Sequence, residues 1–484
     1  MALDHYPLVI GGEAVDAAGK DRFETTDPAT GEVLATVARG GPEDIDAAVG
    51  AARRAFRQTW RPMPVADRAR LLHALSALIL ERTEDLARLE SLDSGKPLTQ
   101  ARTDVTVAAR YFEFYAGVAD KIYGDTIPIS PDLFAYTVRE PHGVTGHIVP
   151  WNYPLQIAAR TIAPSLAAGN AVVLKPAEET PMTAVLLGRM ALEAGLPAGV
   201  VNVVAGFGDE AGAALVAHPG IDHLAFTGSP EVGRLVMKSA ADNFTPVALE
   251  LGGKSPHLVL ADADVAGAVP FILRALIQNA GQTCSAGSRV IVDQRIEGDL
   301  LDALAEAFRA VSIGRGLDDP DLGPLVSEAQ QRRVLGFVEQ GRSEGARLVV
   351  GGGRPDGDAL AAGYFMAPTI FADVRPDQTI ARDEIFGPVL SVLRFSDLEE
   401  AIRIANDSRF GLVSAVWTSD FDKAHWVAGQ LETGQVYINT YGAGGGVELP
   451  FGGRKESGFG REKGIEALRE YTQTKTVAAR IRPQ

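Results

Sequence analysis

The chain of 484 residues contains one cysteine, Cys284, in the segment NAGQTCSAGSR. A lone cysteine is often just a small buried hydrophobic residue, and that alternative stays open here. The glycines and small polar residues on both sides instead indicate a tight, exposed backbone whose N–H groups are free to bind a ligand. A thiol in such a place is a good nucleophile even when little of it is ionised. Cys284 is therefore a candidate nucleophile.

Two other segments carry groups that could assist a nucleophile. Glu250, in ELGGKSP, comes where a predicted strand ends, and a carboxylate held at the carboxyl end of a strand can serve as a base. Asn152, in PWNYP, lies close to a proline on each side, which makes its amide a rigid candidate donor to an oxyanion. A surface glutamate before a turn and an ordinary strand-to-helix turn are the respective alternatives.

A third group of residues could bind phosphate and ribose. In FTGSPEVG we expect a strand, a turn and a helix, with Ser229 as the N-cap and Pro230 at the first helical position. The free N–H groups at such a helix start suit a pyrophosphate, although the glycine spacing differs from the usual dinucleotide fingerprint. Lys175 and Glu178, just past the strand AVVL, could contact ribose hydroxyls.

These segments need a scaffold, and the hydrophobic periodicity predicts one. Apolar residues at helical spacing predict that residues 1–125 are mainly helical, over 44–60, 65–91 and 100–122. From Val144 onward, short β-branched runs alternate with helices, the pattern of a doubly wound parallel sheet. A second α/β block begins near Gly253 and includes a helix over 264–280. FAYTVRE (134–140) and KTVAARI near the end are predicted to pair as a small separate sheet.

Composition excludes several classes of protein. There are 46 Lys and Arg against 62 Asp and Glu, a net charge of −16 that would repel nucleic acid and an anionic membrane. One cysteine cannot form an internal disulfide, and MALDHYPLVI lacks the features of a signal peptide. The eight histidines show no ligand spacing, so we expect no metal site. We therefore expect a cytoplasmic protein without nucleic-acid or membrane partners.

Seven segments in order resemble the NAD(P)-dependent aldehyde dehydrogenase superfamily, over about residues 8 to 480: VPWNYP, LKPAEETP, FTGSPEVG, ELGGKSP, GQTCSAGSR, EIFGP and PFGGRKESGFGREKG. The resemblance implies an α/β fold with two doubly wound parallel-sheet domains and a small β oligomerisation element. The Rossmann-like cofactor domain would comprise residues 1–125 and 141–252, and the catalytic domain residues 253–456. The oligomerisation element would comprise residues 126–140 and 470–484 of a homodimer or homotetramer.

The resemblance also implies roles for the catalytic residues. Cys284 would attack the aldehyde, forming first a thiohemiacetal and then a thioester. Asn152 and the Cys284 backbone N–H would form the oxyanion hole, Glu250 would activate the hydrolytic water, and Glu462 would take part in proton relay. A glutamate at position 250 is absent from the branch that passes its acyl group to coenzyme A, so the product should be a free carboxylic acid.

The cofactor implied is NAD. Glu178 would repel the 2′-phosphate of NADP, but Lys175 beside it softens that preference, so NADP is possible. The residues implied in cofactor binding are Trp151, Lys175, Glu178, Gly228, Ser229, Gly252, Glu384 and Phe386.

The resemblance implies an aldehyde substrate, and a carboxylated semialdehyde is the candidate that we expect. Gln156 and Arg160 are four positions apart and so share a helix face in the implied substrate tunnel. Arg160 follows Asn152 at the offset found in succinic-semialdehyde-type enzymes and could pair with a distal carboxylate. Their second arginine, however, is Gln278 here, and Arg160 could instead form a structural ion pair.

Other aldehydes and other functions also stay open. Gly444, Gly445 and Gly446 replace bulky aromatic residues of many relatives, which leaves room for an aromatic or a betaine-type aldehyde between the walls formed by Tyr153 and Phe451. A catalytically silent structural relative and a thiol esterase that uses the same cysteine are the alternative classes.

Overall fold

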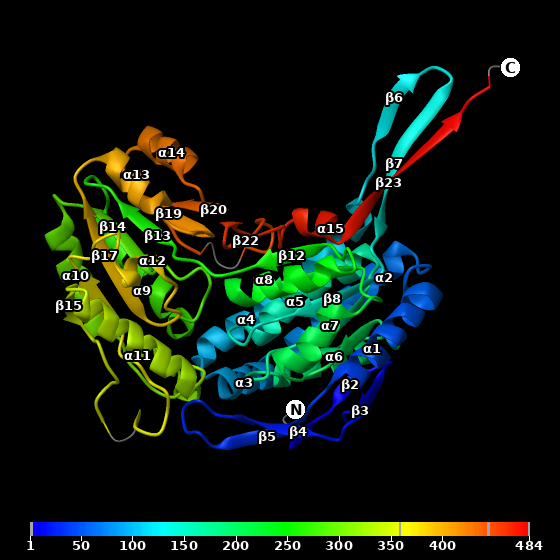
Figure 1. The fold of residues 1–484 in the computed structure, drawn as a ribbon, viewed down its shortest axis with the longest axis horizontal. Coiled ribbons are helices and arrows are strands. Elements are labelled where there is room, and N and C mark those ends of the chain that lie inside the picture. Colours follow the sequence, from blue (N-terminus) through cyan, green and yellow to red (C-terminus); the bar gives the residue numbers. More distant parts are fainter. Residues whose placement is uncertain (1–2, 358–359, 443–445, 483–484) are drawn as a thin grey trace.

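The computed structural model describes residues 3–357, 360–442 and 446–482. Two α/β halves, each built on one large sheet, lie beside each other, and a narrow β arm projects from one of them (Figure 1). Within the described residues, no helix has both the length and the apolar character needed to cross a membrane.

The N-terminal region differs from the expectation that residues 1–125 are mainly helical. It opens with five strands: β1 (His5–Tyr6), β2 (Leu8–Ile10), β3 (Glu13–Val15), β4 (Arg22–Thr26) and β5 (Val33–Ala38). These strands are two to six residues long and several of their side chains are exposed, so they lack a clear alternating pattern. The helices that follow agree with the prediction: α1 (Pro42–Ala55), α2 (Val65–Glu81), α3 (Thr83–Ser94) and α4 (Leu98–Val118).

The first large sheet has eight strands in the order β22-β12-β11-β8-β9-β10-β2-β3. Its central strands are parallel, as predicted: β8 (Val144–Ile148), β9 (Ala171–Lys175), β10 (Val201–Val203), β11 (His223–Thr227) and β12 (Val247–Glu250). The accompanying helices are α5 (Pro154–Ala168), α6 (Met182–Glu193), α7 (Ala213–Ala217) and α8 (Pro230–Ala241). One apolar core joins this sheet to the N-terminal helices.

The second sheet has seven strands in the order β15-β16-β17-β14-β13-β19-β20. Its strands are β13 (Pro256–Val259), β14 (Arg289–Asp293), β15 (Arg347–Val350), β16 (Thr369–Ala372), β17 (Val389–Phe395), β19 (Val413–Trp417) and β20 (Gln435–Ile438). Its helices are α9 (Val265–Ile277), α10 (Glu297–Arg309), α11 (Glu328–Ser343), α12 (Thr379–Arg382), α13 (Leu398–Asn406) and α14 (Phe421–Gln430). Separate apolar clusters line its two faces.

The arm is a three-stranded antiparallel sheet of β6 (Thr126–Ser130), β7 (Leu133–Pro141) and β23 (Thr472–Arg480). The predicted pairing of the two distant segments is confirmed, since β23 pairs with β7 from Thr472↔Pro141 to Arg480↔Leu133. Between the sheets, the chain after β20 forms β21 (Arg454–Lys455), which pairs with β18 (Phe410–Gly411), then β22 (Gly458–Phe459) beside β12 and α15 (Glu466–Glu470). This return crossing brings residues 451–462 back to the first sheet.

Candidate active site

Three neighbouring strands of the first sheet deliver predicted functional residues to one edge. β9 and β10 lie on one side of β8, while β11 and β12 lie on the other, so the strand order reverses beside β8. Such a reversal in an open parallel sheet is where ligands bind, at the carboxyl ends of the strands. Asn152 follows β8, Ser229 follows β11 and Glu250 ends β12. The fold therefore gathers these three residues, which lie far apart in sequence.

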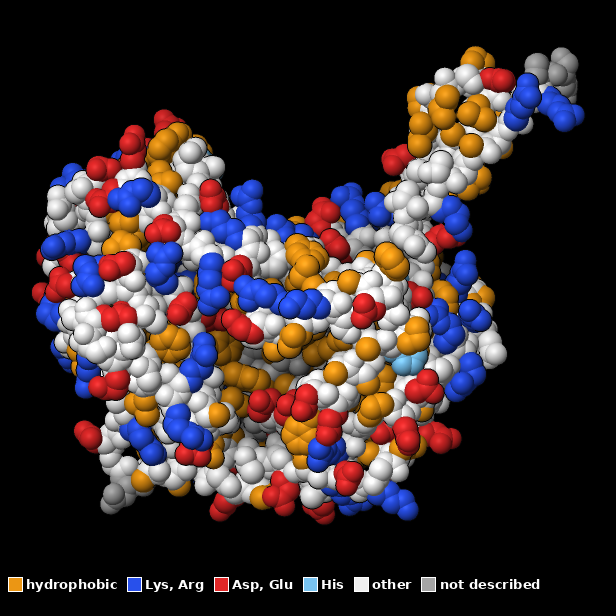
Figure 2. Space-filling model, in the orientation of Figure 1, with side chains coloured by type: hydrophobic (Ala, Val, Ile, Leu, Met, Phe, Trp, Pro, Cys, Tyr) orange, Lys and Arg blue, Asp and Glu red, His pale blue; other side chains and the backbone are white. Residues whose placement is uncertain are grey.

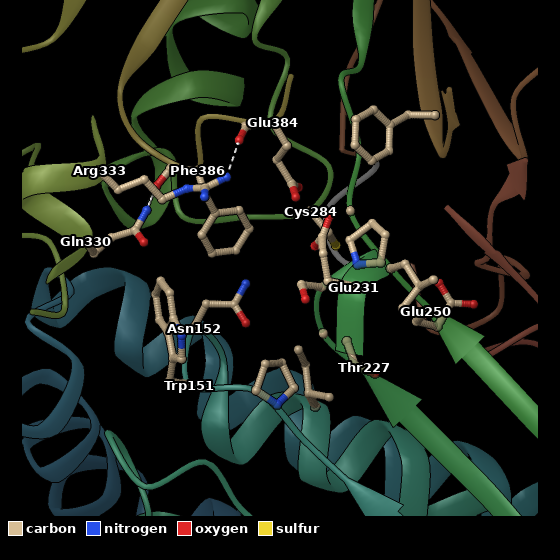
Figure 3. A pocket seen from close by; sticks show the side chains of 18 of the residues that line it. Trp151, Asn152, Thr227, Glu231, Glu250, Cys284, Gln330, Arg333, Glu384 and Phe386 are labelled. Carbon is tan, nitrogen blue, oxygen red and sulfur yellow. Dashed lines mark hydrogen bonds between the residues drawn. The ribbon is translucent and has the colours of Figure 1, made fainter. Parts of the chain in front are cut away.

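A cleft of about 360 Å³ opens at this edge, between the two large sheets. Figure 3 shows the predicted catalytic residues Asn152, Glu250 and Cys284 around it, and Figure 2 shows a hollow lined by apolar side chains between the two halves of the molecule. Six of the predicted cofactor residues line the cleft: Trp151, Gly228, Ser229, Gly252, Glu384 and Phe386.

The other two predicted cofactor residues do not line the cleft. Lys175 and Glu178 form an ion pair with each other, with 2.9 Å between Nζ and Oε2. The Lys175 side chain is almost completely buried, while that of Glu178 is 31% exposed. The pair thus lies at the carboxyl end of β9, next to β8 and outside the walls of the cleft itself.

Anion-binding geometry is present where α8 begins. Ser229 caps the helix, its hydroxyl accepting a hydrogen bond from the Val232 N–H at 3.2 Å. Pro230 occupies the first helical position, as predicted, and the remaining N–H groups of the first turn carry the positive end of the helix dipole. This arrangement suits a phosphate group.

A carboxylate from the second half of the molecule lines the same cleft. Glu384 Oε1 accepts a hydrogen bond from the Gly253 N–H at 3.0 Å, and burial raises the pKa of Glu384 to about 7. A Cβ at Gly252 would lie 2.2 Å from Glu384 Oε2, so a residue with a side chain could not occupy this position without displacing the carboxylate.

Two residues of α11, Gln330 and Arg333, hold the loop that carries Glu384, and neither was predicted from the sequence. Gln330 Nε2 donates to the Phe386 carbonyl at 2.7 Å, and Arg333 donates to the Glu384 carbonyl at 2.9 Å (Figure 3). The Phe386 ring in turn meets the Trp151 ring edge to face, with centroids 5.2 Å apart. The contacts connect the two halves across the cleft.

A second cavity, of about 130 Å³, adjoins the first. It is lined by the four predicted substrate residues, Tyr153, Gln156, Arg160 and Phe451. Cys284 lines both cavities, so the predicted nucleophile lies where they meet. Gly446 lines the second cavity, whereas Gly444 and Gly445, which were expected to widen it, lie outside the described residues.

A left-handed turn places Cys284 at this junction. The predicted helix over 264–280 ends earlier, because α9 stops at Ile277. Asn279, Ala280 and Gly281 then have φ values of 49°, 55° and 75°. Only glycine adopts this conformation without strain, and a Cβ at Gly281 would lie 2.3 Å from the Gly387 carbonyl carbon.

The surroundings of Cys284 and Glu250 oppose ionisation. Burial raises the pKa of the Cys284 thiol to about 12; Arg160 lowers it and Glu250 raises it further. Burial and the nearby Glu462 also hold the pKa of Glu250 well above its ordinary value. Among the described residues, neither carboxylate oxygen of Glu250 has a hydrogen-bond partner. Glu250 can therefore accept a proton from a ligand in the cleft or deliver one to it.

Arg160 forms a buried ion pair with Glu462. Phe451 and Glu462 exchange two backbone hydrogen bonds, of 2.7 and 2.8 Å, which hold the Glu462 backbone against Phe451. The ion-pair alternative noted for Arg160 is therefore present, although Arg160 also lines the second cavity. Lys463, which the sequence analysis did not identify, lines the same cavity with its ammonium 5.2 Å from the centre of the Phe451 ring.

Metal chemistry has no candidate site in the part of the chain that the structure describes, where no cluster of three or more His, Cys, Asp or Glu side chains could hold an ion. The arrangement instead combines a thiol, an amide donor and a carboxylate at the junction of a phosphate-compatible cleft and a smaller pocket. These are the groups needed for covalent attack on a carbonyl, followed by hydrolysis.

Comparison with known proteins agrees with this geometry. Residues 14–477 match the model of the aldehyde dehydrogenase family. The mitochondrial aldehyde dehydrogenase of Equus caballus is 46% identical over 479 residues, covering 98% of this chain and 95% of that protein.

Solved structures give the same result. The NAD+ complex of aldehyde dehydrogenase from Bacillus cereus has a TM-score of 0.96 at 46% identity, over 99% of this chain and 97% of that one. A betaine aldehyde dehydrogenase structure from Staphylococcus aureus, with NAD+, has a TM-score of 0.96 at 40% identity, over 99% and 98%. With the family model spanning nearly the whole chain, the protein belongs to the aldehyde dehydrogenase family, a family of NAD(P)-dependent oxidoreductases.

Proposed function

We propose that this protein oxidises an aldehyde to the free carboxylic acid, with Cys284 as the nucleophile. The observation that carries the proposal is the position of Cys284, which lines both the large cleft and the smaller cavity. A carbonyl carbon bound in the smaller cavity can be attacked by the thiol while its oxygen is held by the Asn152 amide and the Cys284 backbone N–H. Family membership supports the same assignment.

The large cleft fits NAD+. The start of α8 at Ser229 offers N–H groups to a pyrophosphate, and the Glu384 carboxylate offers acceptors to ribose hydroxyls. Glu178, at the end of β9 outside the cleft walls, would favour NAD over NADP because its charge opposes a 2′-phosphate, while its partner Lys175 softens that preference. When bound, NAD+ supplies the hydride acceptor that the oxidation requires.

Hydrolysis is assigned to Glu250. Its raised pKa makes it a more effective base near neutral pH than an ordinary carboxylate, once a water lies against its unpartnered oxygens. The water then attacks the Cys284 thioester, and the carboxylic acid leaves while the thiol is restored. We assign the onward transfer of the proton to Glu462, whose proximity contributes to the raised pKa of Glu250.

A broad aldehyde panel tests the assignment. We expect NADH formation with at least one aldehyde in the native protein and none in Cys284→Ala, with unchanged thermal stability. Ester hydrolysis without NAD+ and without aldehyde oxidation would instead identify a thiol esterase. No turnover of any aldehyde by the folded native protein would identify a catalytically silent relative.

For the substrate, we propose an aldehyde with a distal carboxylate. Arg160, which is ion-paired with Glu462, and Lys463 both line the smaller cavity, and a carboxylate is the group that cations favour. The same cations would disfavour a quaternary ammonium such as betaine aldehyde. The aromatic rings of Tyr153, Tyr437 and Phe451 in the same walls keep an aromatic aldehyde as the second candidate.

Comparing kcat/KM for succinic semialdehyde, benzaldehyde and betaine aldehyde distinguishes these substrates. In Lys463→Met and Arg160→Ala we expect a selective loss with succinic semialdehyde. Equal losses with benzaldehyde in both variants would contradict recognition of a carboxylate.

Assembly as a homodimer or homotetramer through the arm is also proposed. Ile129 and Phe134 on its strands are 62% and 46% exposed, which is unusual for large apolar side chains on a narrow projection. A single free cysteine that has to stay reduced for the reaction fits a cytoplasmic location.

A further inference from the structure

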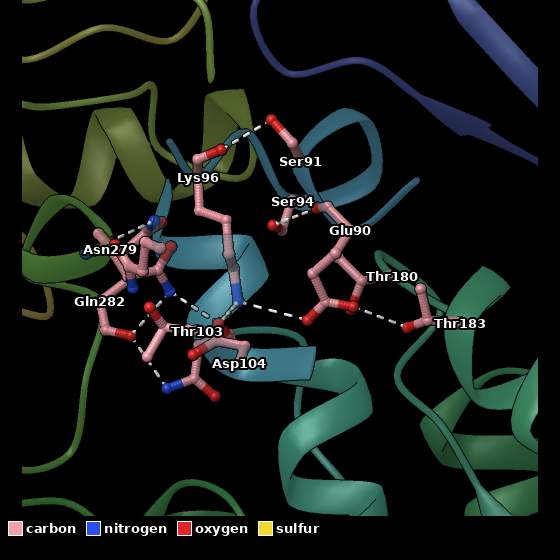
Figure 4. Close-up of polar contacts among 12 residues, drawn as sticks. Glu90, Ser91, Ser94, Lys96, Thr103, Asp104, Thr180, Thr183, Asn279 and Gln282 are labelled. Carbon is pink, nitrogen blue, oxygen red and sulfur yellow. Dashed lines mark hydrogen bonds and ion pairs between the residues drawn. The ribbon is translucent and has the colours of Figure 1, made fainter. Parts of the chain in front are cut away.

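Three charged side chains are buried together behind the candidate active site (Figure 4). Lys96 follows the end of α3, and its ammonium contacts Glu90 of α3 at 3.3 Å and Asp104 of α4 at 2.7 Å. The Lys96 side chain is fully inaccessible to solvent. Burying three ionisable groups costs desolvation energy, and replacing such a cluster by apolar residues is often neutral or stabilising. Stability alone therefore does not account for the cluster.

The Lys96 ammonium has a further partner, the backbone carbonyl of Asn152, at 3.1 Å. It also lies over the Tyr153 ring, 4.5 Å from the ring centre. A second donor, Asn279 Nδ2, reaches the same Asn152 carbonyl at 2.7 Å. Two side chains from distant parts of the chain thus hold one peptide group, between the proposed oxyanion donor and a wall of the substrate cavity.

The Asn152 side chain is tied to the same network. Its Nδ2 donates to the Gln282 carbonyl at 2.9 Å, and Gln282 Nε2 donates to the Asn279 carbonyl at 3.0 Å. Asn279 begins the left-handed turn, and Gln282 follows it, two residues before Cys284. The network therefore connects the turn that carries the amide donor with the turn that carries the thiol.

We propose that Lys96 is a positioning residue for the aldehyde oxidation: with Asn279 it clamps the Asn152 carbonyl and so aims the Asn152 amide at the oxyanion. The inference rests on the proposed role of Asn152. An oxyanion donor acts only when it is fixed where the charge develops, and misplacement by about 1 Å can cost about a hundredfold in rate. A buried ammonium is a stronger and more rigidly placed donor to a carbonyl than a water would be.

The test measures the first turnover, in which the thioester forms and NADH appears. Lys96→Met combined with Asp104→Asn removes the ammonium together with its closest anion, and the parent for comparison is Asp104→Asn alone. We expect the first-turnover rate of the double variant to fall at least about tenfold below that of its parent, while the dissociation constant of NAD+ stays unchanged. Thr183→Val, which removes a 2.8 Å hydrogen bond to Glu90 but does not touch Asn152, should keep the native rate.

A double-mutant cycle separates positioning from a merely structural role. If Lys96 acts through Asn152, removing Lys96 in an Asn152→Ala background should cause no further loss of rate. A full additional loss there, or an unchanged first-turnover rate in the double variant, would overturn the positioning role. If the double variant does not fold, Asn279→Gly provides the test, because glycine keeps the left-handed backbone and removes the other donor to the Asn152 carbonyl. We expect this variant to slow the first turnover, and a native rate would overturn the clamp.

The same experiment identifies which proposal fails. Asn152→Ala with a native first-turnover rate would remove the oxyanion role of Asn152, and with it the proposed function of the site. An impaired Asn152→Ala beside an unimpaired Lys96 variant would remove only the positioning role.

Discussion

Burial raises the pKa of the Cys284 thiol, so even less of it is ionised at neutral pH than in a free cysteine. Its pKa of about 12 contrasts with about 8.5 for a free cysteine. Burial and the neighbouring Glu462 also raise the pKa of the nearby Glu250 carboxyl. Nucleophilic attack therefore requires a change that the bound ligands bring, either a proton transfer or a shift in local charge.

Alkylation of the protein without ligands tests this state of the thiol. Because the thiolate fraction rises tenfold per pH unit below the pKa, we expect the rate of iodoacetamide reaction to keep rising from pH 6 to about 10. The chain has one cysteine, so incorporation measured by mass spectrometry reports Cys284 alone. A rate that is half-maximal at about pH 8.5 and levels off above it would show an ordinary thiol and contradict the effect of burial.

Most secondary-structure elements around the candidate site could be predicted from the sequence, but the turn before Cys284 could not. The strands of the first sheet, the start of α8 and the positions of Asn152 and Glu250 followed from β-branched runs, prolines and glycines with local causes. The end of α9 at Ile277 did not follow, because Ala280 carries no sequence signal for a left-handed backbone.

Other features of the site could not be predicted because no local sequence pattern produces them. Gln330 and Arg333 of α11 lie on a helix rich in polar side chains, and only the tertiary structure shows that they reach the loop of Glu384. Lys96 was missed for the same reason, since its partners come from α3, α4 and the turn after β8. The five N-terminal strands were too short and too exposed to give a periodic pattern.

Gly281→Ala tests the strain in this turn. The φ of 75° and the 2.3 Å approach to the Gly387 carbonyl carbon should reduce the free energy of unfolding by about 2 kcal/mol or more. Gly336→Ala is the matched control, because Gly336 lies in the middle of α11 with open space at its Cβ position, and this change should stabilise by roughly 0.5–1 kcal/mol. Denaturant unfolding measures both, and equal effects would contradict the strained turn.

At the scale of the whole molecule, the arm is the part least able to bury its own apolar surface. Its three strands form a separate sheet with exposed side chains on a projection (Figure 1), while the two α/β halves have their own cores. A partner subunit would bury that surface.

Oligomeric mass in solution tests the arm. The native protein should have a mass of two or four times 51.2 kDa by light scattering, and Phe134→Ser with Ile129→Ser should lower it. Val33→Ser is the control, since Val33 is 53% exposed but lies on β5 of the N-terminal sheet. An unchanged mass in the arm variant would show that the arm does not carry the assembly.

If Cys284 forms a thioester that a water activated by Glu250 then hydrolyses, Glu250→Gln should stop the reaction at the thioester. Under pre-steady-state conditions we expect one rapid burst of NADH, at most one equivalent per active site, followed by negligible turnover, with an acyl group on Cys284 detected by mass spectrometry. Absence of the burst in a folded variant that still binds NAD+, or continued turnover at the native rate, would contradict these roles of Cys284 and Glu250.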